Sequence, residues 1–154
     1  MPAKIPNDEI PSASDLRDLA RTLTAAPARN DDLTSRLQYV ADLVADAGRL
    51  PTEPILAWRD EERTVKHAAI GSELVVGRHP GGRGLAFSGD RSLSRRHFAA
   101  RVSGEFCELK DLDSHNGTAV NQPDNRVRSR ILCNGDLIFA GAQVFAFLDQ
   151  RSAS

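Results

Sequence analysis

The sequence contains little cysteine and no long apolar run, and each absence narrows the class of protein. Its two cysteines, Cys107 and Cys133, lie in apolar, strand-like segments, so we expect both to be small buried side chains. With the four histidines they show no metal-ligand spacing, which predicts no metal and no cofactor. No apolar stretch approaches the ~18 residues of a membrane span, and the N-terminus lacks a signal peptide's apolar run. We therefore expect a cytoplasmic protein with no membrane partner.

A strong excess of one charge is also missing. The net charge of −1 argues against a chain that binds nucleic acid through its overall charge. The charges are nevertheless uneven, because residues 1–62 hold twelve acids and seven bases, whereas residues 74–101 hold six arginines and one acid, Asp90. An arginine-rich stretch in a near-neutral protein indicates either a local anion site or a solvated charged loop, and charge alone favours the loop.

The first third of the chain is predicted to be a tail followed by two helices. Residues 1–13 hold three prolines and little apolar content, which indicates a disordered tail. Two apolar stripes at helical spacing then predict a helical hairpin extension over residues 14–48. The hairpin serves either to pack on the next domain or to form a surface for a partner or for self-association. The stripes are Leu16, Leu19, Ala20 and Leu23, and Leu33, Leu37, Val40, Ala41 and Val44.

From Ile55 the apolar period changes to two, which is typical of β-strands. Many short strands separated by turn signals indicate a mainly β fold, a β-sandwich, over residues 53–149. Trp58, the only tryptophan, is expected in the core or at the contact with the helices. Asn116-Gly117 predicts a two-residue hairpin turn between flanking strands. The expected strands are residues 55–58, 64–70, 74–77, 85–87, 98–102, 106–109, 119–120, 131–132, 137–139 and 143–148.

Polar clusters stand at the ends of these predicted strands. Gly77-Arg78 follows an apolar run, Ser94-Arg95-Arg96-His97 precedes an alternating segment, and Asn116-Gly117 comes before another apolar pair. A binding site on a β scaffold has this arrangement, because strands fix the loops that carry function. With the later Gly135-Asp136, the motifs resemble those of the forkhead-associated domain family in order and spacing. The resemblance implies a sandwich of about eleven strands, here preceded by the helical hairpin.

The resemblance also implies a non-catalytic module that binds phosphothreonine peptides. Arg78 would bind the phosphate, because a guanidinium presents paired donors that match phosphate oxygens. By the family pattern Ser94 bonds the phosphate, Arg95 adds a second donor, and Asn116 grips the peptide backbone. His115 stands where the family often has a hydroxyl residue in contact with phosphate. One phosphate contact is therefore missing there, or an imidazole N–H replaces it.

Three motif residues are assigned to the support of the site rather than to the ligand. In the family the histidine braces the binding loop by internal hydrogen bonds, which is the role expected of His97. Gly77 and Gly117 occupy positions where a Cβ would crowd or strain the chain. The other arginines of these loops would contact the peptide residues on either side of the phosphothreonine. They are Arg83, Arg91 and Arg96.

Two other classes of function compete with this one. Catalysis is not expected, because the sequence has no Gly-x-Ser-x-Gly elbow and no P-loop. The alternative is a phosphate-independent scaffold that binds a partner through the N-terminal helices. The leading interpretation is a phosphothreonine-binding adaptor whose partner is a Ser/Thr kinase or its substrate, and not a nucleic acid. The abundance of arginine, alanine and aspartate is compatible with a bacterial source.

Overall fold

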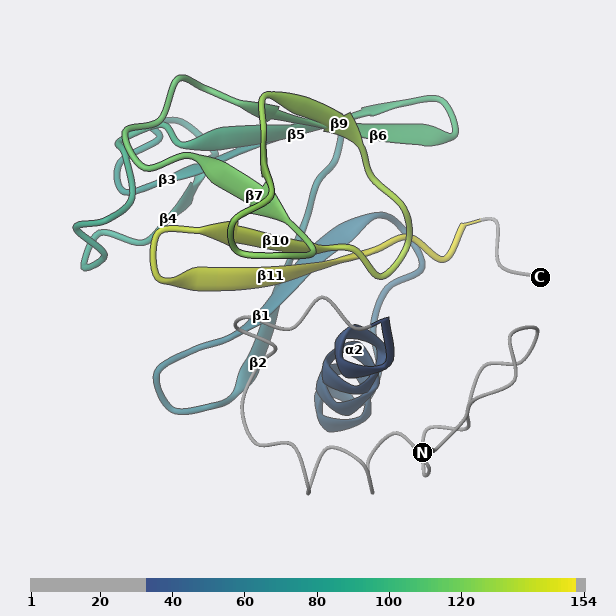
Figure 1. The fold of residues 1–154 in the computed structure, drawn as a ribbon. Coiled ribbons are helices and arrows are strands. Elements are labelled where there is room, and N and C mark those ends of the chain that lie inside the picture. The colour runs from purple at the N-terminus through teal and green to yellow at the C-terminus, as the bar shows by residue number, and fades with distance from the viewer. Residues whose placement is uncertain (1–32, 152–154) are drawn as a thin grey trace.

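The computed structural model describes residues 33–151, which form a β-sandwich with one helix against it (Figure 1). One sheet has six strands in the order β2-β1-β11-β10-β7-β8, and the other has five in the order β4-β3-β5-β6-β9. The predicted sandwich of about eleven strands is thereby confirmed. The strands are β1 (Ile55–Arg59), β2 (Val65–Ala69), β3 (Glu73–Gly77), β4 (Leu85–Ala86), β5 (Phe98–Ser103), β6 (Phe106–Asp111), β7 (Thr118–Val120), β8 (Arg126–Val127), β9 (Ser129–Ile131), β10 (Leu137–Ala140) and β11 (Gln143–Leu148).

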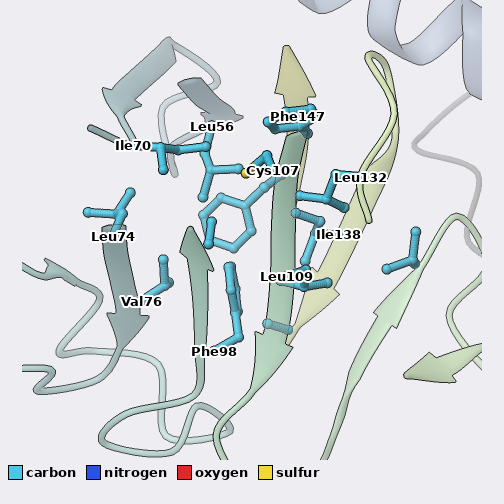
Figure 2. Close-up of a cluster of buried hydrophobic side chains, with 14 of the residues drawn as sticks. Leu56, Ile70, Leu74, Val76, Phe98, Cys107, Leu109, Leu132, Ile138 and Phe147 are labelled. Atoms are coloured by element: carbon cyan, nitrogen blue, oxygen red, sulfur yellow. The ribbon is translucent and has the colours of Figure 1, made fainter. Parts of the chain in front are cut away.

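The core between the sheets follows from the alternation of apolar and polar residues. In β6, Cys107 and Leu109 are buried while Lys110 is exposed, because successive side chains point to opposite faces. Figure 2 shows the buried side chains converging from both sheets. The Phe145 ring lies at the centre of an aromatic group and contacts Trp58 and Phe98 edge-on, with centroids 5.8 and 5.7 Å apart. Trp58 is therefore a core residue, as predicted.

Strand β1 is buried on both faces, because a helix covers its outer side. Leu56 and Trp58 point into the sandwich, whereas Ile55 and Ala57 belong to a second apolar cluster on the outside of the six-stranded sheet. Helix α2 (Leu33–Ala47) contributes to that cluster. The helix residues in contact are Leu43, which is fully buried, and Tyr39, Val40 and Val44.

An ionic contact and a C-terminal glycine fix the end of α2. The Arg59 guanidinium of β1 donates to Asp42 at 3.2 Å and to Asp46 at 2.8 Å on the helix. Gly48 follows the helix with a φ of +80°, the left-handed conformation that commonly ends helices. The second helix of the predicted hairpin is thus present and packs on the sheet. The first helix and the tail over residues 1–13 lie outside the described residues.

The predicted hairpin turn at Asn116-Gly117 is wrong. β6 belongs to the five-stranded sheet and β7 to the six-stranded sheet, so the segment between them crosses from one sheet to the other. A two-residue turn of that type needs a positive φ at both positions. Gly117 has a φ of +86°, but Asn116 is not among the residues with positive φ. The Asn-Gly pair therefore shapes a crossing loop, and its local signal did not reveal which strands pair.

The prediction for one cysteine is also wrong. Cys107 is buried in β6, but Cys133 is exposed. The chain leaves β9 after Ile131, and Cys133 lies in the turn before β10, where its backbone N–H donates to the Asp136 carboxylate at 2.8 Å. The two-residue strand β8 was not predicted, because Val127 is flanked by Arg126 and Arg128 and forms no apolar run. Among the residues that the structure describes, no helix is long and apolar enough to cross a membrane.

We predict that Leu43→Ala destabilises the whole protein. Leu43 is fully buried between α2 and the six-stranded sheet, so its truncation removes apolar contacts and leaves a cavity. The expected loss is about 2–5 kcal/mol in the free energy of unfolding, measured by urea denaturation. Leu33→Ala is the matched control on the same helix, because Leu33 is 54% exposed. Equal effects of the two substitutions would show that α2 does not contribute to the fold through this face.

Candidate functional site

The predicted site residues lie in loops at one end of the sandwich, on the left of Figure 1. The loop after β3 runs alongside the loop that precedes β5. The Arg78 N–H donates to the Ser94 carbonyl at 2.9 Å, and the His79 N–H donates to the Arg95 carbonyl at 3.1 Å. The His97 N–H closes the loop by donating to the Val76 carbonyl at 2.8 Å. Arg78, Ser94 and Arg95 are therefore held together by backbone hydrogen bonds.

Gly77 is required by the close approach of these two loops. A Cβ placed on Gly77 would lie 2.1 Å from the carbonyl oxygen of Arg95 and 2.9 Å from that of Ser94. Real Cβ atoms do not approach backbone atoms so closely, so any side chain here would push the loops apart. Gly117 is constrained differently, since its φ of +86° is unfavourable for other residues and a Cβ would meet Arg126 at 2.9 Å.

His97 joins two loops through its ring. The side chain is fully buried, and its Nδ1 accepts a hydrogen bond from the Ser94 N–H at 3.1 Å. Its Nε2 lies 2.8 Å from the Gly117 carbonyl oxygen. A carbonyl only accepts, so the proton belongs on Nε2 and the ring is the neutral Nε2–H tautomer. This imidazole connects the Ser94 loop before β5 to the loop before β7.

Asp111, at the end of β6, organises the second loop. Its carboxylate accepts from the Ser114 hydroxyl and the Thr118 hydroxyl, each at 2.6 Å, and from the Ser114 N–H at 3.1 Å. The Ser114 hydroxyl oxygen in turn accepts from the Gly117 N–H at 3.0 Å. Burial raises the pKa of Asp111, but the hydrogen bonds from Ser114 and Thr118 outweigh burial and hold the pKa below its ordinary value.

Ser94 and Asn116 make the remaining contacts between the loops. The Ser94 hydroxyl oxygen accepts from the His115 backbone N–H at 2.8 Å, which leaves its own O–H available as a donor. The Asn116 amide donates to the Ser92 carbonyl at 3.0 Å. His115 is exposed, and its bond to Ser94 comes from the main chain. All five residues predicted to bind the ligand are thus present at this end of the sandwich.

Asp90 braces the Ser92 loop against the turn between β10 and β11. Its carboxylate accepts from the Ser92 N–H at 3.0 Å, the Ser92 hydroxyl at 2.5 Å, the Ala142 N–H at 2.9 Å and the Gln143 amide at 3.0 Å. Burial raises the pKa of Asp90, but these hydrogen bonds outweigh burial and keep the pKa below its ordinary value. Asp90 thereby fixes Ser92, whose carbonyl holds Asn116.

No sequence pattern pointed to these bracing residues, which are Asp90, Asp111, Ser114 and Thr118. Each is an ordinary polar residue in a polar loop, so no spacing singled it out. The available signal was Asp90-Arg91-Ser92, where an aspartate two residues before a serine can accept the serine's backbone N–H.

Two arginines at the site have no carboxylate partner among residues 33–151. Arg78 is half-buried and its Nε is fully buried, yet no described residue accepts a hydrogen bond from that side chain. Arg95 is exposed, and it forms no ion pair within residues 33–151. The neighbouring carboxylates do not neutralise the arginines, since Asp90 and Asp111 accept from hydroxyl and amide donors. Two cations beside a hydroxyl donor form an arrangement that can bind an anion. Within the same residues, no cluster of His, Cys, Asp and Glu could hold a metal.

Comparison with known families agrees with this geometry. Residues 74–141 match the family model of the FHA domain, the forkhead-associated domain, and these residues include Arg78, Ser94, Arg95 and Asn116. The chain carries an FHA domain. Its structure resembles one from a study of phosphothreonine-dependent FHA domain interactions, with 29% identity, a TM-score of 0.52, and coverage of 63% of this chain and 96% of that one.

Two further relatives are informative. The FHA domain of FhaA, solved in complex with the intracellular domain of Rv3910, is 28% identical, with a TM-score of 0.52, over 62% of this chain and 99% of that one. A curated protein of Corynebacterium jeikeium (strain K411), named oxoglutarate dehydrogenase inhibitor, is 42% identical over 76 residues. That match spans 49% of each chain, so it covers about half of the relative. Neither the FHA family nor the inhibitor's name indicates catalysis.

We predict that Asp111→Asn lowers the stability of the FHA domain in a pH-dependent way. The carboxylate has a lowered pKa, so its stabilising contribution is complete above its unfolded pKa of about 3.9 and is lost as the pH falls through the lowered folded pKa. The substitution should cost about 1–3 kcal/mol in the free energy of unfolding at pH 7. This difference should shrink below about pH 4.

The control for this prediction is Asp113→Asn in the same loop. Asp113 is exposed and has a φ of +62°, a conformation that asparagine tolerates. Urea denaturation of all three proteins between pH 7 and pH 3 provides the measurement. A cost for Asp111→Asn that stays constant over this range would show that the ionised carboxylate does not organise the loop.

Proposed function

We propose that the protein is a cytoplasmic, non-catalytic adaptor that binds a phosphothreonine segment of a partner in Ser/Thr kinase signalling. One observation carries the proposal, namely the half-buried Arg78 guanidinium that no described carboxylate neutralises. A permanently charged group in this setting gains by binding an anion. The Ser94 hydroxyl, whose oxygen already accepts from His115, supplies a donor beside it.

Each predicted ligand contact has a chemical role in this proposal. Arg78 binds two phosphate oxygens with its paired N–H groups, and the Ser94 hydroxyl donates to a third. Arg95 adds charge from the adjacent exposed position. Asn116, held by the Ser92 carbonyl, offers its amide oxygen to a backbone N–H of the peptide. His115 contributes its backbone N–H to Ser94, and its exposed imidazole stands next to the phosphate.

The relatives support a phosphorylated protein as partner. One similar structure comes from work on phosphothreonine-dependent FHA interactions, and another contains an intracellular domain of a second protein. The curated relative, of which this chain covers about half, is named an inhibitor of an enzyme. We infer that the partner of this protein is a Ser/Thr kinase or a substrate of one. The face of α2 that holds Val40, Leu43 and Val44 packs on the sheet, so that face is not available to the partner of a phosphate-independent scaffold.

We predict that Arg78→Ala abolishes phosphothreonine binding while the domain stays folded. Each charge-assisted hydrogen bond contributes about 1.5–3 kcal/mol, and Arg78 is expected to make two, so affinity should fall at least about 100-fold. Arg78→Lys should also bind poorly, because an ammonium cannot reproduce the paired donors. Isothermal titration with a phosphothreonine peptide selected from a library measures the loss.

Arg101→Ala serves as the control, because Arg101 is an exposed arginine on β5, outside the loops of the site. It should bind the peptide like the wild type. Full affinity in Arg78→Ala, with an unchanged melting temperature, would contradict the assignment of the site. Binding of the unphosphorylated peptide with equal affinity would contradict the function itself.

We predict that Asp90 supports peptide binding through Asn116. Asp90→Asn should loosen Ser92 and so misplace the Asn116 amide, which weakens phosphopeptide affinity by about three- to tenfold. In an Asn116→Ala background the same substitution should have little further effect, because the group that it positions is already gone. Asp149→Asn is a control at a carboxylate that binds Arg151. Additive losses in the double variant would show that Asp90 acts independently of Asn116.

A further inference from the structure

A groove of about 890 Å³ is lined in part by Ser92, the residue whose carbonyl accepts from the Asn116 amide. Three segments that are distant in sequence form its walls: the end of β1 with the turn that follows it, the loop Gly89–Ser92, and Ala142 with the first residue of β11, Gln143. Asp90 joins two of these walls, since it accepts from both Ser92 and Ala142. The groove therefore adjoins the site that contains Asn116 and has firmly held walls.

Two aromatic side chains line this groove. Trp58 and Phe87 meet edge to face, with ring centroids 5.5 Å apart and planes at 73°. Trp58 is 8% exposed and Phe87 is half-buried, so both rings are fixed by the core behind them. Aromatic surface of this kind suits the alkyl stem of a long side chain, and its negative ring faces attract a cation.

Acidic residues dominate the charge around these rings. The lining includes the carboxylates of Asp60, Glu61, Glu62 and Asp90 and the guanidinium groups of Arg59 and Arg91. Arg59 is paired with Asp42 and Asp46 on α2, and Asp60 is paired with Lys66 at 3.9 Å, so neither cation neutralises Glu61 or Glu62. Glu61 and Glu62 are exposed, and neither side chain bonds to any residue within 33–151.

The turn that carries these two glutamates is well ordered by hydrogen bonds. The Asp60 carboxylate accepts from the Glu62 N–H and from the Thr64 N–H, both at 2.9 Å. The Arg63 N–H donates to the Asp60 carbonyl at 2.9 Å, and Arg63 adopts a φ of +66°. Glu61 and Glu62 are thus presented at the groove by a closed turn rather than by a loose loop.

We propose that this groove binds a lysine- or arginine-containing segment of the same phosphorylated partner. The alkyl stem packs on Trp58 and Phe87, and the charged head pairs with Glu61 and Glu62. The proposal rests on the function proposed above, because the phosphothreonine at Arg78 and Ser94 brings the segment to the groove. The partner is then recognised by two opposite charges, a phosphate at Arg78 and Ser94 and a basic side chain in the groove.

The test uses peptides that share one phosphothreonine and its immediate neighbours. The first peptide has glutamines on both sides of this shared segment. In the second, lysines replace the glutamines on the N-terminal side, and in the third they replace those on the C-terminal side. The wild-type protein should prefer one lysine peptide by about three- to tenfold, the range expected of exposed ion pairs. Glu61→Gln/Glu62→Gln should remove the preference while leaving the affinity for the glutamine peptide unchanged. Glu105→Gln/Glu108→Gln, which alters the turn before β6 and β6 itself in the other sheet, should retain the preference.

Each other outcome is decisive. If the wild type binds the phosphopeptides without any preference, or if the preference survives Glu61→Gln/Glu62→Gln, the groove proposal is overturned and the proposed function stands. If no phosphothreonine peptide binds, the function fails and the groove proposal fails with it. An unphosphorylated lysine peptide that binds as tightly as the phosphorylated one would show a separate site, which also overturns the proposal. If the Glu61→Lys/Glu62→Lys variant binds a glutamate peptide more tightly than the lysine peptide, the groove proposal is supported.

Discussion

The pair of hydrogen bonds made by the buried His97 ring is the constraint on which the rest of the site depends. The ring accepts from Ser94 and donates to Gly117, so one side chain fixes the loop before β5 and the loop before β7. Loss of the ring would leave a backbone N–H and a backbone C=O without partners, at a cost of about 1–3 kcal/mol for each buried group. The interaction needs the neutral tautomer with its proton on Nε2, which the Gly117 carbonyl enforces.

The charges of the site are arranged so that its arginines stay available. Two carboxylates of the binding loops, Asp90 and Asp111, accept hydrogen bonds from hydroxyl and amide donors. Arg59, by contrast, lies outside these loops and is paired with two aspartates of α2. Arg78 has no such partner among the described residues, and its Nε is buried. These acidic groups therefore hold the loops in place and do not pair with Arg78. The half-buried guanidinium remains able to bind an external anion.

The sequence predicted the sandwich and most of its strands, because apolar alternation is a local property that survives in the fold. It also pointed to Arg78, Ser94 and Asn116, which carry family motifs at strand ends. It failed at Asn116-Gly117, because an Asn-Gly pair favours a turn but does not say which strands pair across it. It failed at Cys133, where the chain leaves the sheet one residue earlier than the apolar run suggested.

The bracing contacts could not have been predicted, since they join residues that are distant in sequence. Asp90 and Gln143 are 53 positions apart, and His97 and Gly117 are 20 apart. Nothing in the local composition around Asp90 distinguishes it from a solvated acid. The groove beside Ser92 has the same origin, because its three walls meet only once both sheets are assembled. The role of a polar loop residue depends on which other loops lie beside it in the fold. The spacing of apolar residues in the sequence does not show this.

A nuclear magnetic resonance titration of the full chain with a phosphothreonine peptide tests the central claim most directly. We expect shifts of the Arg78 Nε–H, the backbone amides of Ser94 and Arg95, and the Asn116 side-chain amide. The same peptide without phosphate should leave these resonances unchanged. Shifts confined to helix α2, or identical shifts with and without phosphate, would contradict the claim that the loops held by His97 form a preorganised phosphate site.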